Sequence, residues 1–354
     1  MFHNRFIILK ITSLTVAISA LIAGCNSTDH QSSNDDIAIE NSSDKVSIND
    51  IAHYNITIAP DLSNRINPTL YKRPVSDAEI TSRITEAFYP TIVRYSLRLG
   101  KEDMRKTGQL DVLRIGFINQ QTIGQKGVDV TELNFAQFDR NQADRIAYIN
   151  NKYPKDKSEF VKSFSTLNDA YASKNARADI WSYFNDGIKI DVVDTSVVER
   201  PNPIENRLNR DIKCNVLVLF TDGYIEAGLN SKAHCEGNKC YYLDSKTIDN
   251  FRKAFKQSGS KDMKAFFKQE GYGIIPVDNP LLKNLNVIVM EMFDRSKDQK
   301  GGATVHPTDW DILQIFWQDW LKESGVKSVE LHQTTNSAKE AVDNVNRFLR
   351  SRAI

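Results

Sequence analysis

The stretch NVLVLFTDG, from Asn215 to Gly223, decides the fold class. Its five successive apolar residues, Val216 to Phe220, indicate a strand that is buried on both faces, which is typical of a parallel sheet. LNVIVMEMF, residues 285–293, has the same continuous apolar character. Because such strands alternate with helical patterns along the chain, we expect an α/β fold with a mostly parallel, Rossmann-like central sheet flanked by helices and carrying an insertion.

The remaining elements are read from shorter patterns. A helix over 76–100 begins with a capping box made by Ser76 and Glu79, and a helix over 307–325 takes Thr308 as its N-cap. Residues 187–194 predict a weak strand, and 194–211, with two prolines, predict a loop. Further strands are expected at 54–59 and 110–118, with 127–136 pairing back on the latter, and helices at 141–175 and 176–186.

The N-terminus resembles a bacterial lipoprotein signal. Arg5 and Lys10 give a positive start, a short apolar run follows, and LIAGC places Cys25 directly after two small residues. We expect residues 1–24 to be a signal peptide and Cys25 to be acylated, for example with palmitate. In the alternative, the segment is an uncleaved membrane span, but Lys10 leaves fewer than the roughly 18 clean apolar residues that a span needs.

The predicted lipid anchor sets the domain organisation and the location. Residues 25–50 are rich in Ser, Asn and Asp and predict a disordered tether, which leaves 51–354 as one domain. The protein would be lipid-anchored in the cell envelope, at the outer membrane if the cell has two membranes. A net charge of +1 gives no support to a nucleic-acid partner.

Three cysteines follow Cys25. Cys235 and Cys240 bracket the hydrophilic tetrapeptide EGNK, so a local disulfide is expected outside the cytoplasm. The alternative is a metal site of His234, Cys235 and Cys240, which lacks a clear fourth ligand. Cys214 opens an apolar strand and is expected to be a buried free thiol.

Polar side chains follow two of the predicted strands. Asp61 and Ser63 come after the first strand, and Thr221 and Asp222 come after the strongest one. In open α/β sheets, sites form outside the carboxyl ends of the strands, so we expect both loops to meet at one edge. Carboxylate and hydroxyl oxygens suit a hard cation such as Mg2+ or Mn2+. In the simpler interpretation, Asp-x-Ser and Asp-Gly only form turns.

These two motifs, DLSNR and VLVLFTDG, resemble those of the von Willebrand factor type A domain family. The resemblance implies a metal-ion-dependent adhesion site in which Asp61, Ser63 and Asp222 hold the cation. Thr221 is expected to bind the ligand beside them, and in the simpler interpretation it only supports the loop. A middle-loop hydroxyl would come from Ser173, with Thr166 as the competitor. The stretch between the two motifs is longer than is usual in the family, which places the insertion there.

Arg65 departs from the family pattern, because a second serine should stand at this position. A guanidinium is always charged and does not ligate a cation. Three outcomes are open: Arg65 points away and water takes its place, the site binds metal weakly, or Arg65 supplies the positive charge and receives an acidic ligand directly.

The leading functional hypothesis is a binding module and not an enzyme. A lipid-anchored type A-like domain would hold the cation, and an acidic residue of a protein partner would complete its coordination. A metal-dependent hydrolase using the same edge is the first alternative. The second is a metal-free envelope scaffold with a degenerate site, which Arg65 favours.

Overall fold

The computed structural model describes residues 46–67, 73–94, 111–116, 118, 134–135, 147, 151–172, 178–202, 206–226, 234–298 and 300–352. The chain divides into two units, Met1–Lys45 and Val46–Ile354, and all of the described residues belong to the second unit. The predicted signal peptide, Cys25 and almost all of the predicted tether lie outside the described residues, and so does Ser173.

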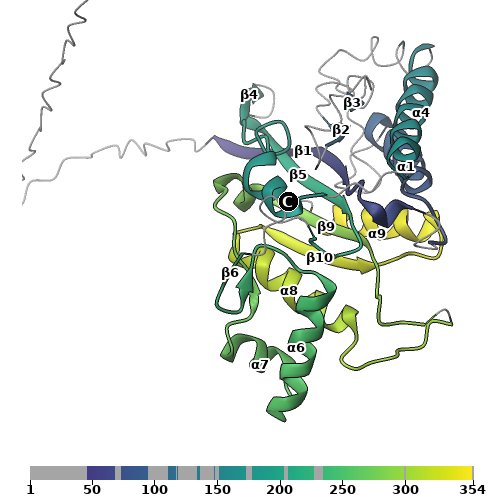
Figure 1. The fold of residues 1–354 in the computed structure, drawn as a ribbon. Helices are drawn as coiled ribbons and strands as arrows, with labels where there is room; N and C mark the ends of the chain where they lie inside the picture. Colours follow the sequence, from purple (N-terminus) through teal and green to yellow (C-terminus); the bar gives the residue numbers. More distant parts are fainter. Residues whose placement is uncertain are drawn as a thin grey trace, which may run out of the picture. The chain divides into compact units, whose positions relative to one another are not determined.

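A mostly parallel sheet forms the centre of this unit (Figure 1). Its order is β10-β9-β5-β1-β2-β3, and β4 pairs with β5 beside this path. Only β3 and β4 run antiparallel to their partners. The strands are β1 (Ser47–Pro60), β2 (Val112–Ile115), β3 (Asn134–Phe135), β4 (Val198–Asn202), β5 (Arg207–Phe220), β9 (Leu285–Met292) and β10 (Ser328–Gln333).

The strand order confirms the predicted fold class. Apart from β4, the strands taken in chain order lie as 3-2-1-4-5-6, the arrangement of Rossmann-like sheets, whose order reverses between the first and the fourth strand. Here those two strands are β1 and β5, which pair in register from Ser47↔Arg207 to Pro60↔Phe220. The long register brings their carboxyl ends level with each other.

Helices pack on both faces of the sheet (Figure 1). One apolar cluster joins α1 (Asp77–Arg94), α4 (Tyr153–Ala172) and α9 (Ala338–Ser351) to one face. A second cluster, rich in aromatic rings, covers the other face. Its elements are α5 (Ile180–Ser182), the π-helical turn η3 (Tyr183–Gly187), α6 (Ser245–Ser258), α7 (Met263–Gln269), α8 (Asp309–Glu323) and the 3-10 turn η4 (Pro280–Asn284).

Strong capping and apolar signals were interpreted correctly. The Ser76 hydroxyl accepts from the Glu79 backbone N–H at the start of α1, and Thr308 forms the capping box of α8. β1 begins at Ser47, ahead of the expected boundary at residue 51, because its first residues pair with β5.

Two weaker predictions were wrong. Residues 187–194 form a turn and not a strand, since the Asn55 side-chain amide donates to the carbonyls of Asp191 and Val192 and fixes an irregular backbone. The expected loop 194–211 contains β4 and the start of β5. Pro201 is compatible with β4 because this strand pairs on one side only among the described residues.

The three cysteines that follow Cys25 have the states predicted for them. Cys235 and Cys240 form a disulfide that closes the β6 (Cys235–Glu236) and β7 (Lys239–Cys240) hairpin, to which β8 (Gly273–Ile274) adds in parallel. Cys214 is a buried free thiol. Among the described residues, no helix combines the length and apolar composition that crossing a membrane requires.

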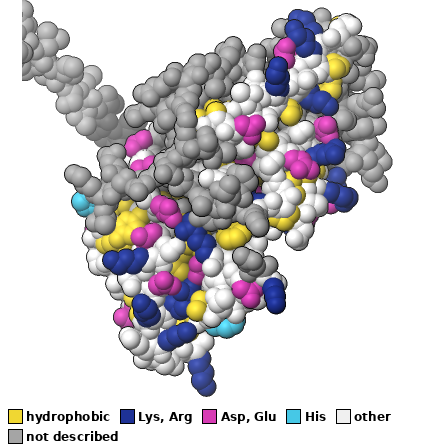
Figure 2. Space-filling model, turned by 45° about the vertical axis from the view of Figure 1, so that its right-hand side comes forward, with side chains coloured by type: hydrophobic (Ala, Val, Ile, Leu, Met, Phe, Trp, Pro, Cys, Tyr) yellow, Lys and Arg dark blue, Asp and Glu magenta, His cyan; other side chains and the backbone are white. Residues whose placement is uncertain are grey.

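The surface carries both signs of charge. On the face drawn in Figure 2, basic and acidic side chains are interspersed over the described surface, in line with the net charge of +1. No broad single-sign field of the kind that attracts a polyanion is visible on that described surface.

Two Val→Ala substitutions test whether β5, and not β4, contributes to the buried core. Val218 in β5 is fully buried, so Val218→Ala should lower the free energy of unfolding by about 2 kcal/mol through lost apolar contact and a residual cavity. Val198 in β4 is 49% exposed, and Val198→Ala should change it by less than about 0.5 kcal/mol. Urea denaturation compares the two; equal losses would contradict this placement of the core.

Candidate functional site

Three loops meet at the carboxyl edge of the sheet, after the neighbouring strands β1, β5 and β9. Backbone hydrogen bonds join them: Asp61 N–H donates to Phe220 O at 2.8 Å, and Thr221 N–H donates to Met290 O at 3.1 Å. The predicted convergence of the Asp61 and Asp222 loops at one edge is therefore correct. The third loop, after β9, was not included in that prediction.

Asp61 is held in a turn and buried, with 2% of its surface exposed. Its Oδ1 accepts from the Ser63 backbone N–H at 2.9 Å, and its Oδ2 accepts from the Thr221 hydroxyl at 3.1 Å. The turn interpretation of Asp-x-Ser is thus correct as local geometry. Burial raises the pKa of Asp61 to about 6; nearby Arg65 opposes this rise and Asp222 adds to it.

Arg65 lies on the 3-10 turn η1 (Asn64–Ile66) and points inward, with 2% exposure. Its Nη2 donates to Asp77 Oδ2 at 2.5 Å and to Phe220 O at 2.9 Å, and its Nε lies 3.9 Å from Asp61 Oδ2. Burial opposes its charge, but Asp77, Asp61 and Asp222 outweigh this effect and raise its pKa. The outcome in which Arg65 points away is therefore wrong, since its positive charge lies against Asp77 and Asp61; weak metal binding and the direct binding of an acidic ligand by Arg65 stay predictions.

Asp77, the first residue of α1, is shared by two arginines. Its Oδ2 accepts from Arg65 and its Oδ1 accepts from Arg73 Nη1 at 2.6 Å. Burial alone would raise the pKa of Asp77, but the two guanidinium groups outweigh it and lower the pKa. This carboxylate anchors the first loop to α1, and sequence reasoning missed it because Ser76–Glu79 already explained the start of the helix.

Asp222 forms an ion pair with Arg295, the arginine of the third loop. Its Oδ2 accepts from Arg295 Nη2 at 2.8 Å, and its Oδ1 accepts from the Tyr224 backbone N–H at 3.1 Å. Gly223 between them has a φ of 91°, and a Cβ there would lie 2.8 Å from Met292 Cε. The tight turn therefore requires glycine, and it presents Asp222 to the third loop.

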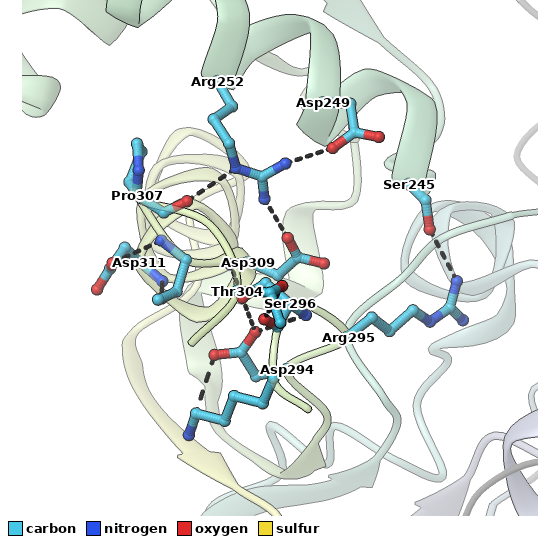
Figure 3. Close-up of polar contacts among 12 residues, drawn as sticks. Ser245, Asp249, Arg252, Asp294, Arg295, Ser296, Thr304, Pro307, Asp309 and Asp311 are labelled. Carbon is cyan, nitrogen blue, oxygen red and sulfur yellow. Dashed lines mark hydrogen bonds and ion pairs between the residues drawn. The ribbon is translucent and has the colours of Figure 1, made fainter. Parts of the chain in front are cut away.

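Arg295 is the most connected cation of the edge. Its guanidinium lies 3.7 Å from the centroid of the Tyr224 ring, and its Nη1 donates to Glu226 at 2.8 Å and to Ser245 at 3.0 Å. Figure 3 shows Arg295 reaching toward Ser245 of α6. The Arg295 side chain is 23% exposed, whereas Glu226 is half exposed.

A cluster of polar contacts positions the Tyr224 ring over which Arg295 lies (Figure 3). Asp294 Oδ1 accepts from both the backbone N–H and the hydroxyl of Ser296, and the same hydroxyl accepts from the Asp309 N–H at 3.0 Å. Asp309 also accepts from Arg252 and from the Tyr224 hydroxyl. The cluster ties the third loop to α6 and α8 and fixes the ring on which Arg295 lies.

A signal for the third loop was present in the sequence. Asp294-Arg295-Ser296 directly follows the apolar stretch 285–293, so the rule that placed Asp61 and Asp222 at the strand ends applies there as well. Ser173 lies outside the described residues, so its expected role stays a prediction. Its competitor Thr166 lies within α4.

The resemblance implies Mg2+ or Mn2+, and the carboxylate oxygens of Asp61 and Asp222 show whether such an ion fits. Both oxygens of Asp61 and both of Asp222 already accept hydrogen bonds, and guanidinium groups lie beside each carboxylate. The described residues contain no group of three or more His, Cys, Asp or Glu side chains placed to hold a metal. As arranged, the residues do not fit a divalent cation, and the metal stays a prediction that this geometry does not favour.

Glu291 is a strained acid beside this edge. Its φ is 66°, at a bulge where β10 shifts register against β9, and the residue is fully buried. Its Oε1 accepts from the Thr335 N–H and hydroxyl, while its Oε2 has no hydrogen-bond partner among the described residues. Burial raises the pKa of Glu291, with a smaller contribution from Asp77.

Comparison with known proteins adds no family assignment. No family model matches the chain, and no curated protein matches it either. The site is therefore interpreted from its own geometry.

Asp77→Asn tests whether the buried ion pairs of Asp77 with Arg65 and Arg73 hold the edge together. Removing this charge leaves Arg65 buried without its main partner, so the free energy of unfolding should fall by about 3–5 kcal/mol. Asp343→Asn is the matched control: Asp343 is exposed and pairs with Lys339, so its loss should leave the free energy of unfolding almost unchanged. A loss for Asp77→Asn as small as that of the control would show that the buried chain does not hold the edge together.

Glu291→Gln tests the strained acid. Because the folded-state pKa is raised, the stability contributed by Glu291 is fully present below its unfolded pKa and is lost as pH rises through the folded value. The difference in unfolding free energy between the variant and the wild type should therefore move in favour of the variant between pH 5 and pH 8, a range that lies above the ordinary glutamate pKa of about 4.3. Urea denaturation at both values measures it; an advantage that shrinks would contradict the raised pKa.

Proposed function

We propose that the protein is a binding module whose carboxyl sheet edge receives an acidic side chain of a protein partner on Arg295. The observation that carries the proposal is the placement of this guanidinium. It lies over the Tyr224 ring, pairs with Asp222 on its inner side, and reaches the half-exposed Glu226.

Arginine suits this task without a metal. Its planar guanidinium offers parallel N–H donors that match a carboxylate, and stacking on an aromatic ring holds the plane in place. Because Asp222 and Tyr224 fix the group before binding, little side-chain entropy remains to be lost when a partner binds.

Glu226 acts in this proposal as an internal stand-in for the partner. It is half exposed, and an exposed ion pair contributes little to stability, so an incoming carboxylate can take its place at Arg295 Nη1. The exchange becomes favourable when the partner also covers the edge and excludes water from the new pair.

The likeness to type A domains supports protein recognition at this same edge. The proposal keeps the expected lipid anchor at Cys25, which would present the edge at the surface of a membrane in the cell envelope. It involves no reaction step. In the version with Mg2+ or Mn2+, the partner carboxylate would instead complete a cation held by Asp61, Ser63 and Asp222.

Affinity enrichment from envelope extracts of the source cells separates the two versions. The soluble body carrying Arg295→Lys should lose a partner that the wild type retains, because a single ammonium group cannot hold Asp222 on one nitrogen and offer a second nitrogen to the partner carboxylate. Glu226→Gln should retain it several-fold more strongly, because the internal competitor is gone. EDTA should change nothing.

Arg347→Lys, an exposed arginine of α9 paired with Glu330, is the matched control and should bind as the wild type does. A partner that is lost in EDTA and kept by Arg295→Lys would contradict the proposal and favour the cation. A set of retained proteins that is identical for the wild type and Arg295→Lys would contradict recognition through Arg295.

A further inference from the structure

The burial of Arg65 needs an explanation that packing does not provide. An arginine with 2% exposure costs free energy to desolvate, and its Nε and Nη1 have no hydrogen-bond partner among the described residues. Three carboxylates favour its charged form, those of Asp77, Asp61 and Asp222.

We infer that Arg65 is the built-in cation of this edge, and that it keeps closed a divalent-cation site that the rest of the loop retains. The guanidinium bonds to Asp77 and lies beside Asp61, whose other partners are a hydroxyl and a backbone amide. It thus neutralises, from within the chain, the charge that an ion would otherwise neutralise.

The charge balance explains why the site closes. The three carboxylates of Asp61, Asp77 and Asp222 face three guanidinium groups, and each guanidinium contacts at least one of them. Removing Arg65 leaves one negative charge in excess in a buried region, where unscreened charges interact strongly. The excess lies on Asp61, because Asp77 keeps Arg73 and Asp222 keeps Arg295.

The remaining oxygens are suitable for a hard cation once the guanidinium is gone. Thr221 donates its hydroxyl to Asp61, Ser63 follows Asp61 by two residues in the same turn, and a serine at position 65 would add a third hydroxyl on η1. Carboxylate and hydroxyl oxygens with room for water are the ligands that Mg2+ and Mn2+ take. The substitution R65S should therefore open the site.

The test compares purified soluble wild type with R65S in EDTA and in MnCl2, by thermal unfolding and by the electron paramagnetic resonance signal of bound Mn2+. The wild type should show the same midpoint in both buffers and no bound Mn2+. R65S should unfold at a lower temperature in EDTA, regain several degrees in MnCl2, and bind one Mn2+. R65K, which keeps the charge, should stay insensitive, and R65S combined with Asp222→Asn should lose the binding.

R65Q controls for stability that R65S loses only because the side chain is smaller. Glutamine keeps much of the side-chain volume and offers an oxygen. R65Q should therefore also gain stability from MnCl2. Mn2+ binding by the wild type that depends on Asp222 would overturn the inference. So would an R65S and an R65Q that MnCl2 does not stabilise. No partner is present in this test, so its outcome is independent of recognition through Arg295.

Discussion

The ion pair between the buried guanidinium of Arg65 and Asp77 is the constraint on which the carboxyl edge depends. It joins the loop after β1 to the first turn of α1, and the same nitrogen of Arg65 donates to the carbonyl of Phe220 at the end of β5. One side chain therefore positions the loop after β1, the start of α1 and the end of β5, which lies 155 residues further along the chain. Since a buried charge is tolerated only while its partners stay in place, the arrangement is close to all-or-none.

The sheet beneath makes this constraint effective. β1 and β5 pair along their whole length, so Asp61 and Thr221 leave the sheet at the same level and can bond to each other. Arg295 repeats the arrangement one strand further along, with Asp222 as its inner partner and Tyr224 as its support. The edge is thus built from alternating carboxylates and guanidinium groups. Its outer member, Arg295, is the one that solvent and a partner can reach.

Much of this architecture follows from local sequence, and some of it could not. β5 and β9 were predictable because continuous apolar runs are rare outside buried strands. The meeting of Asp61 with Asp222 followed from the rule that sites lie beyond the carboxyl ends of such strands. The partner of Arg65 was not predictable, because a pairing across a loop and a helix start leaves no periodic trace. Residues 187–194 were misinterpreted because the Asn55 side chain, distant in sequence, decides their conformation.

Anomalous diffraction at the manganese edge from wild-type crystals soaked in MnCl2 tests the central claim most directly. If Arg65 takes the place of the cation, no anomalous peak lies among Asp61, Ser63 and Asp222, and the guanidinium density stays beside Asp77. An anomalous peak bound by Asp61 and Ser63, with Arg65 turned away from Asp77, would contradict the account.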